Sequence, residues 1–381
     1  MAAAPLDGVL VVDLTRILAG PFATLVLSDL GARVIKVEVP GRGDDARRIG
    51  PFVGDRSAYF LSLNRGKQSI ALDLRDESDR VVFEKLLERA DVLAENFRPG
   101  VMERLGYGWE ALHRRYPRLV FASTSGFGQT GPYSDRPAYD IVVQAMGGIM
   151  SLTGHPGDPP TRVGSSMGDI TAGLFTAIGV VAALFERGRN GEGRHVDVSM
   201  LDAQVATLEN AIARYVATGE VPGPLGSRHP SITPFEALET KDGHAVVAAG
   251  NDALFATLCE AIGSPELAGD SRFDSNERRT QNAVELKRLL EAALITRTTA
   301  EWLERLGGAG VPCGPVNDIA AILEDPQIAA RNMIISVDDP DAGTLELAGN
   351  PIKLSGVDDP TTRPTAPELD ADRTRILAEL K

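Results

Sequence analysis

The chain has 381 residues, a formal net charge of −14 and 43% hydrophobic residues. This composition is typical of a globular protein that is long enough for two domains. The acidic charge disfavours nucleic acid and anionic membrane surfaces as partners.

Short apolar runs alternate with helical patterns over the first 130 residues. We predict strands at 9–14, 33–39, 69–74, 91–97 and 119–125, and helices at 22–32, 81–90 and 101–116. Such alternation is typical of a parallel sheet covered by helices. The apolar run 170–185 predicts a buried helix, because a membrane span needs about 20 residues.

A Gly- and Pro-rich stretch at 218–234 predicts a linker. After it we expect a strand at 244–250 and helices near 251–262, 283–295 and 299–306, followed by a Pro-rich tail over the surface. The expected organisation is a large domain at 1–217, a linker at 218–235, a small domain at 236–325, and a linker and C-terminal segment at 326–381 that returns to the large domain.

Two cysteines stand far apart, at Cys259 and Cys313, and no CxxC pair exists. Neither a zinc site nor a disulfide framework is therefore indicated. The N-terminal MAAAPLDG lacks the basic and apolar segments of a signal peptide, so we expect a cytoplasmic protein.

Ligands of parallel sheets bind beyond the carboxyl ends of the strands. Here these ends lead into loops 15–21, 96–100 and 126–140. The fingerprint GxGxxG does not follow the first strand, which disfavours a nicotinamide or flavin cofactor. Basic residues near these loops favour a polyanionic ligand such as a nucleotide or coenzyme. They are Arg42, Arg47, Arg48, Arg65, Lys67, Arg75, Arg98 and Arg104.

Asp169, in MGDITAG, stands just before the long apolar run. It is a candidate N-cap of that helix and a candidate nucleophilic carboxylate, and both roles can hold together if one oxygen caps while the other reacts. With an ordinary pKa near ~3.9 the carboxylate is already ionised at neutral pH. Backbone N–H groups at Gly168 or in the AAGN loop (248–251) are candidate stabilisers of an oxyanion. The five histidines show no metal-ligand spacing, so we expect no metal. The GxSxG motif is absent, so Ser–His–Asp hydrolysis has no local support, and no P-loop motif occurs.

The chain resembles the class III coenzyme A transferases over nearly its whole length. The resemblance lies in PLDGVLVVDLTRILAGPFAT, GARVIKVE, LNRGKQSIALDL, DVLAENFRPGVMERLG, GFGQTGPYSDRPAYD, MGDITAG, GEGRHVDVSMLDA and GVPCGPV. It implies an α/β fold, with a Rossmann-like large domain and a smaller α/β domain joined by long linkers, in an interlocked homodimer.

The resemblance also implies the site. Asp169 is the expected nucleophile, and coenzyme A, as the acyl-CoA substrate, is the expected cofactor, without metal, nicotinamide or flavin. Carried over by motif, the expected coenzyme contacts are Leu18, Ala19, Leu72, Arg75, Asn96, Phe97, Arg98, Arg104, Tyr139 and Asp140.

The expected reaction moves CoA from an acyl-CoA donor to a small carboxylic acid through a covalent aspartyl intermediate. Formyl-CoA transferases carry Gln where this chain has Leu18, and a longer Gly-rich loop than 246–252, which argues against a formyl-CoA and oxalate preference. The alternatives are an α-methylacyl-CoA racemase, whose His–Asp pair is replaced here by Tyr139–Asp140, and a non-catalytic acyl-CoA binding protein. Small dicarboxylates with succinyl-CoA as donor are the expected substrates, and Arg228 and His229 are candidate ligands of a second carboxylate.

Overall fold

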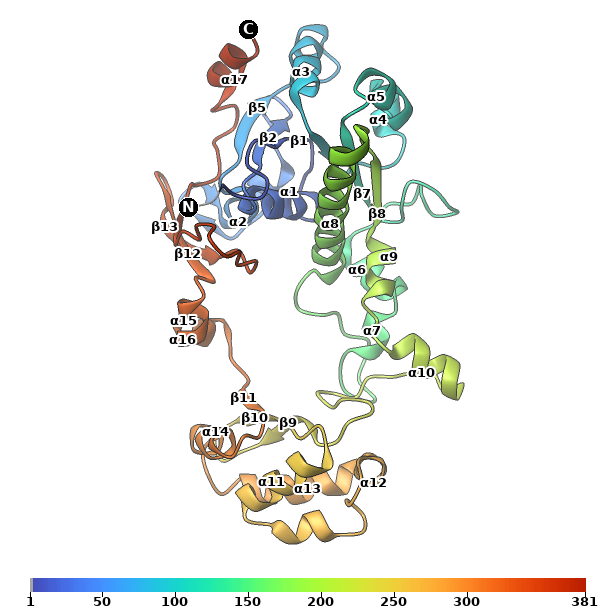
Figure 1. The fold of residues 1–381 in the computed structure, drawn as a ribbon, viewed down its shortest axis with the longest axis vertical. Helices are drawn as coiled ribbons and strands as arrows, with labels where there is room; N and C mark the ends of the chain where they lie inside the picture. The colour runs from blue at the N-terminus through green and yellow to red at the C-terminus, as the bar shows by residue number, and fades with distance from the viewer. Residues whose placement is uncertain (1–2) are drawn as a thin grey trace. The chain divides into compact units, whose positions relative to one another are not determined.

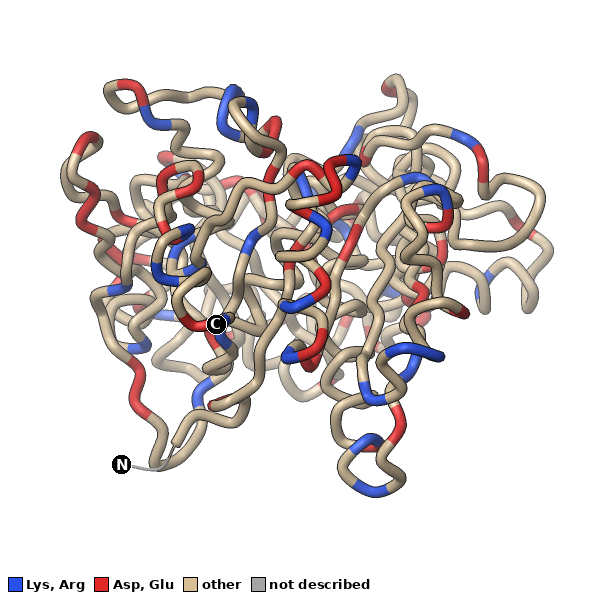
Figure 2. Tube along the Cα trace, turned by 90° about the horizontal axis from the view of Figure 1, so that it is seen from above, with Lys and Arg blue, Asp and Glu red and all other residues tan. Residues whose placement is uncertain are grey.

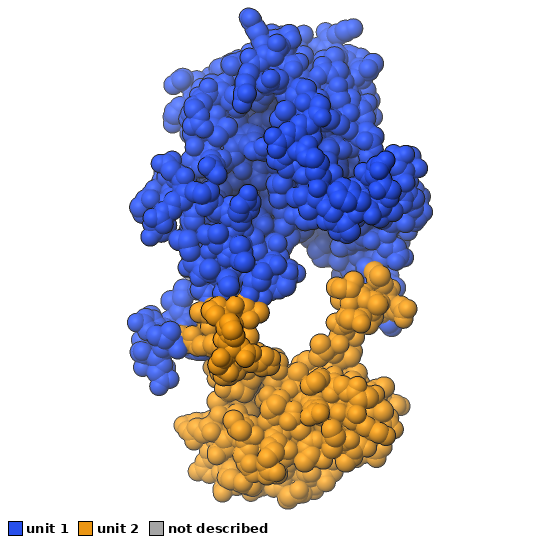
Figure 3. All heavy atoms as spheres, turned by 180° about the vertical axis from the view of Figure 1, so that it is seen from behind, with its two compact units in different colours: residues 1–150, 162–221, 326–381 blue, residues 151–161, 222–325 orange. Residues whose placement is uncertain are grey.

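The computed structural model describes residues 3–381, which form two compact units. Unit 1 comprises Met1–Met150, Arg162–Val221 and Pro326–Lys381, and unit 2 comprises Ser151–Thr161 and Pro222–Asp325. Figure 3 colours the two units separately. The short segment Ser151–Thr161 thus packs with residues that follow it by more than sixty positions, although it interrupts unit 1 in the sequence.

A six-stranded parallel sheet forms the centre of unit 1 and confirms the predicted α/β class (Figure 1). Its order is β5-β2-β1-β6-β7-β8, the Rossmann-like order in which the winding direction reverses between β1 and β6. The strands are β1 (Leu10–Asp13), β2 (Arg33–Glu38), β5 (Gln68–Ala71), β6 (Val92–Glu95), β7 (Val120–Ser125) and β8 (His195–Ser199). The strand pattern in the sequence did not predict β8.

Both faces of this sheet are covered, because alternate residues of each strand enter different hydrophobic clusters. Val11 packs with residues of α1 (Ala19–Asp29) and α8 (Met167–Asn190). Val12 packs on the opposite face with residues of α3 (Glu77–Arg89), α5 (Trp109–Arg115) and α17 (Arg373–Glu379). The result is a three-layer sandwich, whose loops at the carboxyl ends of the strands are free to bind a ligand.

Two predicted helices have different bounds in the structure. The single helix predicted at 101–116 is wrong: α4 (Val101–Leu105) and α5 are separated at Gly106, which adopts φ 86°. A left-handed residue ends a helix, and glycine adopts that conformation without a steric cost. The helix predicted at 22–32 begins earlier, at Ala19, because Pro21 is tolerated in a first turn.

Helix α8 is the longest element, with 24 residues. It is long and apolar enough to cross a membrane, a test that core helices of soluble proteins also pass. It runs against α1, β7 and β8, and a Cβ added at Gly173 would lie 2.7 Å from the carbonyl oxygen of Ala19. Glycine at this position therefore lets the two helices approach closely.

The C-terminal segment of unit 1 adds a second sheet, in which β12 (Ile334–Asp339) pairs with β13 (Gly343–Ala348) and β14 (Thr362–Arg363). A buried ion pair of 2.9 Å joins Arg56 to Asp339. The remaining elements of unit 1 are η1 (Asp45–Arg48), β3 (Phe52–Val53), β4 (Arg56–Ser57), α2 (Ala58–Asn64), α6 (Asp140–Met146), α9 (Met200–Ala206), α10 (Ala211–Thr218) and α16 (Pro326–Ala330). The short helix α7 (Ile149–Leu152) includes residues of both units.

Unit 2 has its own core and an antiparallel sheet of order β11-β10-β9. Trp302 and Phe273 are fully buried in that core. The elements of unit 2 are β9 (Phe235–Glu239), β10 (His244–Ala248), α11 (Asp252–Ile262), η2 (Pro265–Gly269), α12 (Asn276–Gln281), α13 (Ala283–Leu294), α14 (Thr299–Gly308), β11 (Cys313–Pro315) and α15 (Ile319–Glu324). Acidic and basic residues are interspersed along the whole trace (Figure 2).

Candidate active site

The loop that follows β1 adopts a strained conformation at the point where the sheet reverses direction. Ile17 has φ 69°, a conformation that a β-branched residue adopts only when its surroundings impose it. The N–H of Ile17 donates to Asp44 Oδ1 (3.1 Å), and the N–H of Arg16 donates to Asn96 Oδ1 (2.8 Å). Side chains from two other loops therefore hold the turn open toward the carboxyl ends of β1 and β6.

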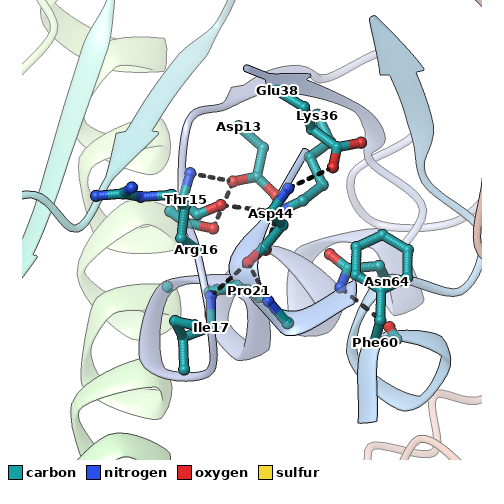
Figure 4. A network of polar contacts seen from close by, with 12 residues as sticks. Asp13, Thr15, Arg16, Ile17, Pro21, Lys36, Glu38, Asp44, Phe60 and Asn64 are labelled. Atoms are coloured by element: carbon teal, nitrogen blue, oxygen red, sulfur yellow. Dashed lines mark hydrogen bonds and ion pairs between the residues drawn. The ribbon is translucent and has the colours of Figure 1, made fainter. Parts of the chain in front are cut away.

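A buried ionic network lies behind this turn (Figure 4). Lys36 Nζ donates to the carbonyl oxygen of Thr15 (2.7 Å) and pairs with Asp44 Oδ2 (2.9 Å). Burial alone would lower the pKa of Lys36, but the carboxylates of Asp44 and Asp13 outweigh it and raise that pKa. The network thus fixes the backbone of the turn by charges that have almost no access to water.

Asp169 is the third residue of α8, and the position before the helix is Ser166. The alternative that Asp169 caps the helix is therefore wrong, because the cap position lies three residues earlier. Burial, and then the like charge of Asp140, raises the pKa of Asp169 to about 7. The carboxyl is thus close to half-ionised at neutral pH, whereas the sequence suggested an ordinary pKa and full ionisation.

Asp140, at the start of α6, is the residue that fixes the beginning of α8. Its Oδ1 accepts the N–H of Gly168 (2.8 Å), and its Oδ2 accepts Nε2 of Gln144 (2.8 Å). The N–H of Gly168 is therefore engaged, and the expectation that it stabilises an oxyanion is wrong. Asp140 is buried and contacts the helix that carries Asp169.

Two cavities lie at the carboxyl ends of the strands, and between them they are lined by Asp169 and all the coenzyme contacts expected from the resemblance. The strand-end groove, of about 590 Å³, is lined by Leu72, Arg75, Phe97 and Arg104 among others. The Asp169 cavity, of about 850 Å³, is lined by Leu18, Ala19, Asn96, Phe97, Arg98, Tyr139, Asp140 and Asp169 among others. Arg16 and Phe97 line both, so the two spaces adjoin at the strand order reversal.

Only part of the basic group noted in the sequence is available to a ligand. Lys67 is buried against Asp13, Arg65 pairs with Asp29, and Arg47 pairs with Glu38. Arg42 and Arg48 both pair with Asp45. Within residues 3–381, no ion pair is formed by Arg75, Arg98 or Arg104, whose side chains are exposed along the two cavities. These three retain the capacity to bind anionic groups.

Residues of the Asp169 cavity that were not named as site candidates from the sequence include Arg16, Tyr59, Arg136 and Arg162. Burial, and then the carboxylates of Asp169, Asp44 and Asp140, raises the pKa of Tyr59 to about 12. Its phenol is thus a neutral hydrogen-bond donor. Arg16 lies within the highlighted loop 15–21, but Tyr59 and Arg162 carry no local signal. Among the described residues, no cluster of three or more His, Cys, Asp or Glu side chains is arranged for a metal ion.

Comparison with known proteins identifies the family. The model of CoA-transferase family III matches residues 6–373. The chain is 52% identical to acetyl-CoA:oxalate CoA-transferase of Acetobacter aceti, over 98% of this chain and 95% of that protein. It is 39% identical to succinyl-CoA:glutarate CoA-transferase of Homo sapiens, over 99% of this chain and 86% of that protein.

A solved structure supports the same assignment. The crystal structure of a CaiB/BaiF family protein from Brucella suis superimposes with a TM-score of 0.88 and 40% sequence identity, covering 100% of both chains. The sheet order and the strand-end cavities agree with the full-length match to the family. The chain therefore belongs to CoA-transferase family III and is a CoA-transferase.

Proposed function

We propose that this enzyme transfers CoA from an acyl-CoA to a small carboxylic acid by covalent catalysis at Asp169. The observation that carries the proposal is the position of Asp169. It lies in the first turn of α8, in a cavity that adjoins the strand-end groove. A carboxylate there reaches a thioester whose coenzyme portion occupies the groove, where Arg75 and Arg104 offer unpaired positive charge to its phosphates.

The proposed chemistry conserves all atoms without a redox partner or ATP. The Asp169 carboxylate attacks the thioester carbonyl, and the CoA thiolate leaves to give a mixed anhydride. The thiolate then attacks the aspartyl carbonyl, which releases the donor acid as a carboxylate and leaves an aspartyl-CoA thioester. The acceptor carboxylate attacks that thioester, and the same two steps in reverse form the new acyl-CoA and restore Asp169.

The raised pKa of Asp169 fits this role. A desolvated carboxylate is a stronger nucleophile than one in water. Tyr59, as a neutral donor in the same cavity, is placed to bind a developing oxyanion in place of the engaged N–H of Gly168.

The acceptor proposed here is a dicarboxylic acid. The names of the relatives from Acetobacter aceti and Homo sapiens specify oxalate and glutarate as their acids, and both are dicarboxylates. The cavity around Asp169 also contains the cations Arg16, Arg98, Arg136 and Arg162, more than a coenzyme thioester requires at its reactive end.

Mass spectrometry after incubation with acetyl-CoA, oxalyl-CoA or succinyl-CoA tests the covalent step. The expected result is an adduct on the peptide that contains Asp169, cleaved by hydroxylamine. Asp169→Asn should form no adduct and show no transfer while it still binds CoA. An adduct on another residue, or full transfer by Asp169→Asn, contradicts the mechanism. Exchange of the α-proton of 2-methylacyl-CoA without an acceptor acid would instead indicate racemase chemistry.

We also propose that the enzyme is a homodimer. Helix α8 exposes a row of apolar side chains, and α10 adds a second exposed set, more than an isolated chain in water is expected to leave uncovered. These side chains are Leu174, Phe175, Ile178, Val181, Phe185, Ile212, Tyr215 and Val216. Light scattering coupled to size exclusion should give twice the mass of 40.5 kDa, and an interlocked pair should not exchange subunits with a tagged copy. A monomer at micromolar concentration contradicts this.

A further inference from the structure

Arg162 is the cation of the Asp169 cavity that is linked most directly to the nucleophile. Its guanidinium lies 3.4 Å from Asp140 Oδ2, and Asp140 Oδ1 accepts the N–H of Gly168, the residue before Asp169. Two of the other three cations of this cavity lie over aromatic rings. The guanidinium of Arg16 lies over the ring of Phe97, and that of Arg136 lies 3.9 Å from the centre of the ring of Tyr133.

The contact between Arg162 and Asp140 is replaceable. It is a single long contact, and both oxygens of Asp140 already accept shorter hydrogen bonds, from Gly168 and Gln144. Asp140 therefore stays satisfied when Arg162 leaves. Arg162 in turn makes no bidentate contact and keeps a side chain that is 42% exposed. A free carboxylate offers it two parallel hydrogen bonds, the geometry that guanidinium groups prefer.

The backbone that carries Arg162 is held firmly, so the side chain moves without the loop. Gln144 is fully buried, and its Oε1 accepts the N–H of Val163 (2.9 Å) while its Nε2 donates to the carbonyl oxygen of Ser165 (3.3 Å). One amide thus anchors two residues of the loop between Arg162 and α8. Such anchoring keeps the backbone of Arg162 close to the beginning of the helix while its guanidinium moves.

We infer that Arg162 binds the second carboxylate of a dicarboxylic acid whose first carboxylate reacts at Asp169, and so selects dicarboxylic over monocarboxylic acids. The inference rests on the proposed function and adds the residue that sets its specificity. Arg162 and Asp169 line the same cavity, so one small diacid can contact both. Arg228 and His229, suggested by the sequence, belong to unit 2, and the ring Nδ1 of His229 already accepts the N–H of Ser231.

The test compares Arg162→Gln with the wild-type enzyme in steady-state transfer from acetyl-CoA to oxalate or succinate, and to the monocarboxylate propionate. We expect the KM for the diacids to rise about 10- to 100-fold, because a charge-assisted bidentate contact is lost. Propionate transfer should be unchanged. Arg162→Lys should give an intermediate KM. Arg194→Gln, which breaks the exposed ion pair with Glu186 outside both cavities, is the matched control and should change neither.

Adduct formation at Asp169 distinguishes a failure of the proposed covalent mechanism from a failure of the role assigned to Arg162. If wild-type enzyme forms no adduct and transfers no CoA, the proposed function fails. If the adduct forms but Arg162→Gln loses diacid and propionate transfer equally, or loses neither, the assignment of Arg162 is overturned and the covalent mechanism stands. A selective loss with Arg136→Gln but not with Arg162→Gln overturns it as well, as does a wild-type enzyme that accepts only monocarboxylates.

Discussion

Asn96 and the backbone of Arg16 form two reciprocal hydrogen bonds, from the N–H of Arg16 to Asn96 Oδ1 and from Asn96 Nδ2 to the carbonyl oxygen of Arg16, both 2.8 Å long. The two residues are 80 positions apart and follow β1 and β6, between which the sheet changes direction. A single amide therefore joins the two loops where ligands of such sheets bind.

Replacing Asn96 by Ala should loosen the turn that contains Ile17. We expect the KM for acetyl-CoA to rise about five- to thirtyfold, since one to two hydrogen bonds of about 1 kcal/mol each no longer position the loop. Asn96→Asp keeps the acceptor for Arg16 but loses the donor, and should give a smaller change. Steady-state kinetics with a saturating acid acceptor measures both, and an unchanged KM in Asn96→Ala would show that the loops are positioned without this amide.

The pKa of about 7 at Asp169 predicts a pH dependence of the reaction. Because only the carboxylate attacks the thioester, kcat/KM for the acyl-CoA should fall about tenfold per pH unit below about pH 7 and level off above it. Asp140→Asn removes the like charge but keeps an oxygen that accepts the N–H of Gly168, so the midpoint should move to lower pH. A midpoint that does not move would assign the raised pKa to burial alone.

The raised pKa of Asp169 also makes the free energy of unfolding depend on pH. The pKa of Asp169 is raised in the folded protein, so between about pH 4 and pH 7 the unfolded chain binds fewer protons at this residue than the folded one, and the free energy of unfolding falls as pH rises. Asp169→Asn removes this pH-dependent decrease in the free energy of unfolding, because asparagine does not titrate. We expect a higher melting temperature than that of the wild type at pH 8 and little difference at pH 4. Equal melting temperatures at both pH values would contradict the raised pKa.

Local sequence patterns located the strand-end loops and placed Asp169 near the beginning of a long helix, because strands, turns and helix starts depend on neighbouring residues. They did not locate the partners of these residues. Arg65 and Lys67 resembled ligand-binding residues, yet their carboxylate partners, Asp29 and Asp13, lie 36 and 54 positions away. The hydrogen bond from Gly168 to Asp140 spans 28 positions and determines both the start of α8 and the availability of an N–H. Such pairings follow from the packed fold and leave no periodic signal.

The buried pair of Lys36 and Asp44 should contribute strongly to stability. Lys36→Met leaves the carboxylates of Asp44 and Asp13 buried without a full complement of positive charge, which typically costs about 3–5 kcal/mol. Urea denaturation measures the loss, and Lys36→Met combined with Asp44→Asn should recover part of it. If the double variant is no more stable than Lys36→Met, the charge of Asp44 is not what Lys36 compensates.

Two glycines of α8 give opposite predictions. At Gly173 a Cβ would lie 2.7 Å from the carbonyl oxygen of Ala19 and 3.1 Å from the ring of Phe22, so Gly173→Ala should push α8 away from α1. We expect a loss of about 1–3 kcal/mol in the free energy of unfolding and a lower kcat, because the displaced helix carries Asp169.

At Gly188 a Cβ would meet no atom within 4 Å, and the backbone is helical. Gly188→Ala should therefore stabilise the enzyme by up to about 1 kcal/mol through helix propensity and leave kcat unchanged. Thermal denaturation and kinetics of the two variants, measured side by side, separate packing at the α1–α8 contact from the general effect of adding a methyl group to the helix. A loss of kcat in both variants would show that activity responds to any change in α8, and a loss in neither would show that Ala19 yields without moving Asp169.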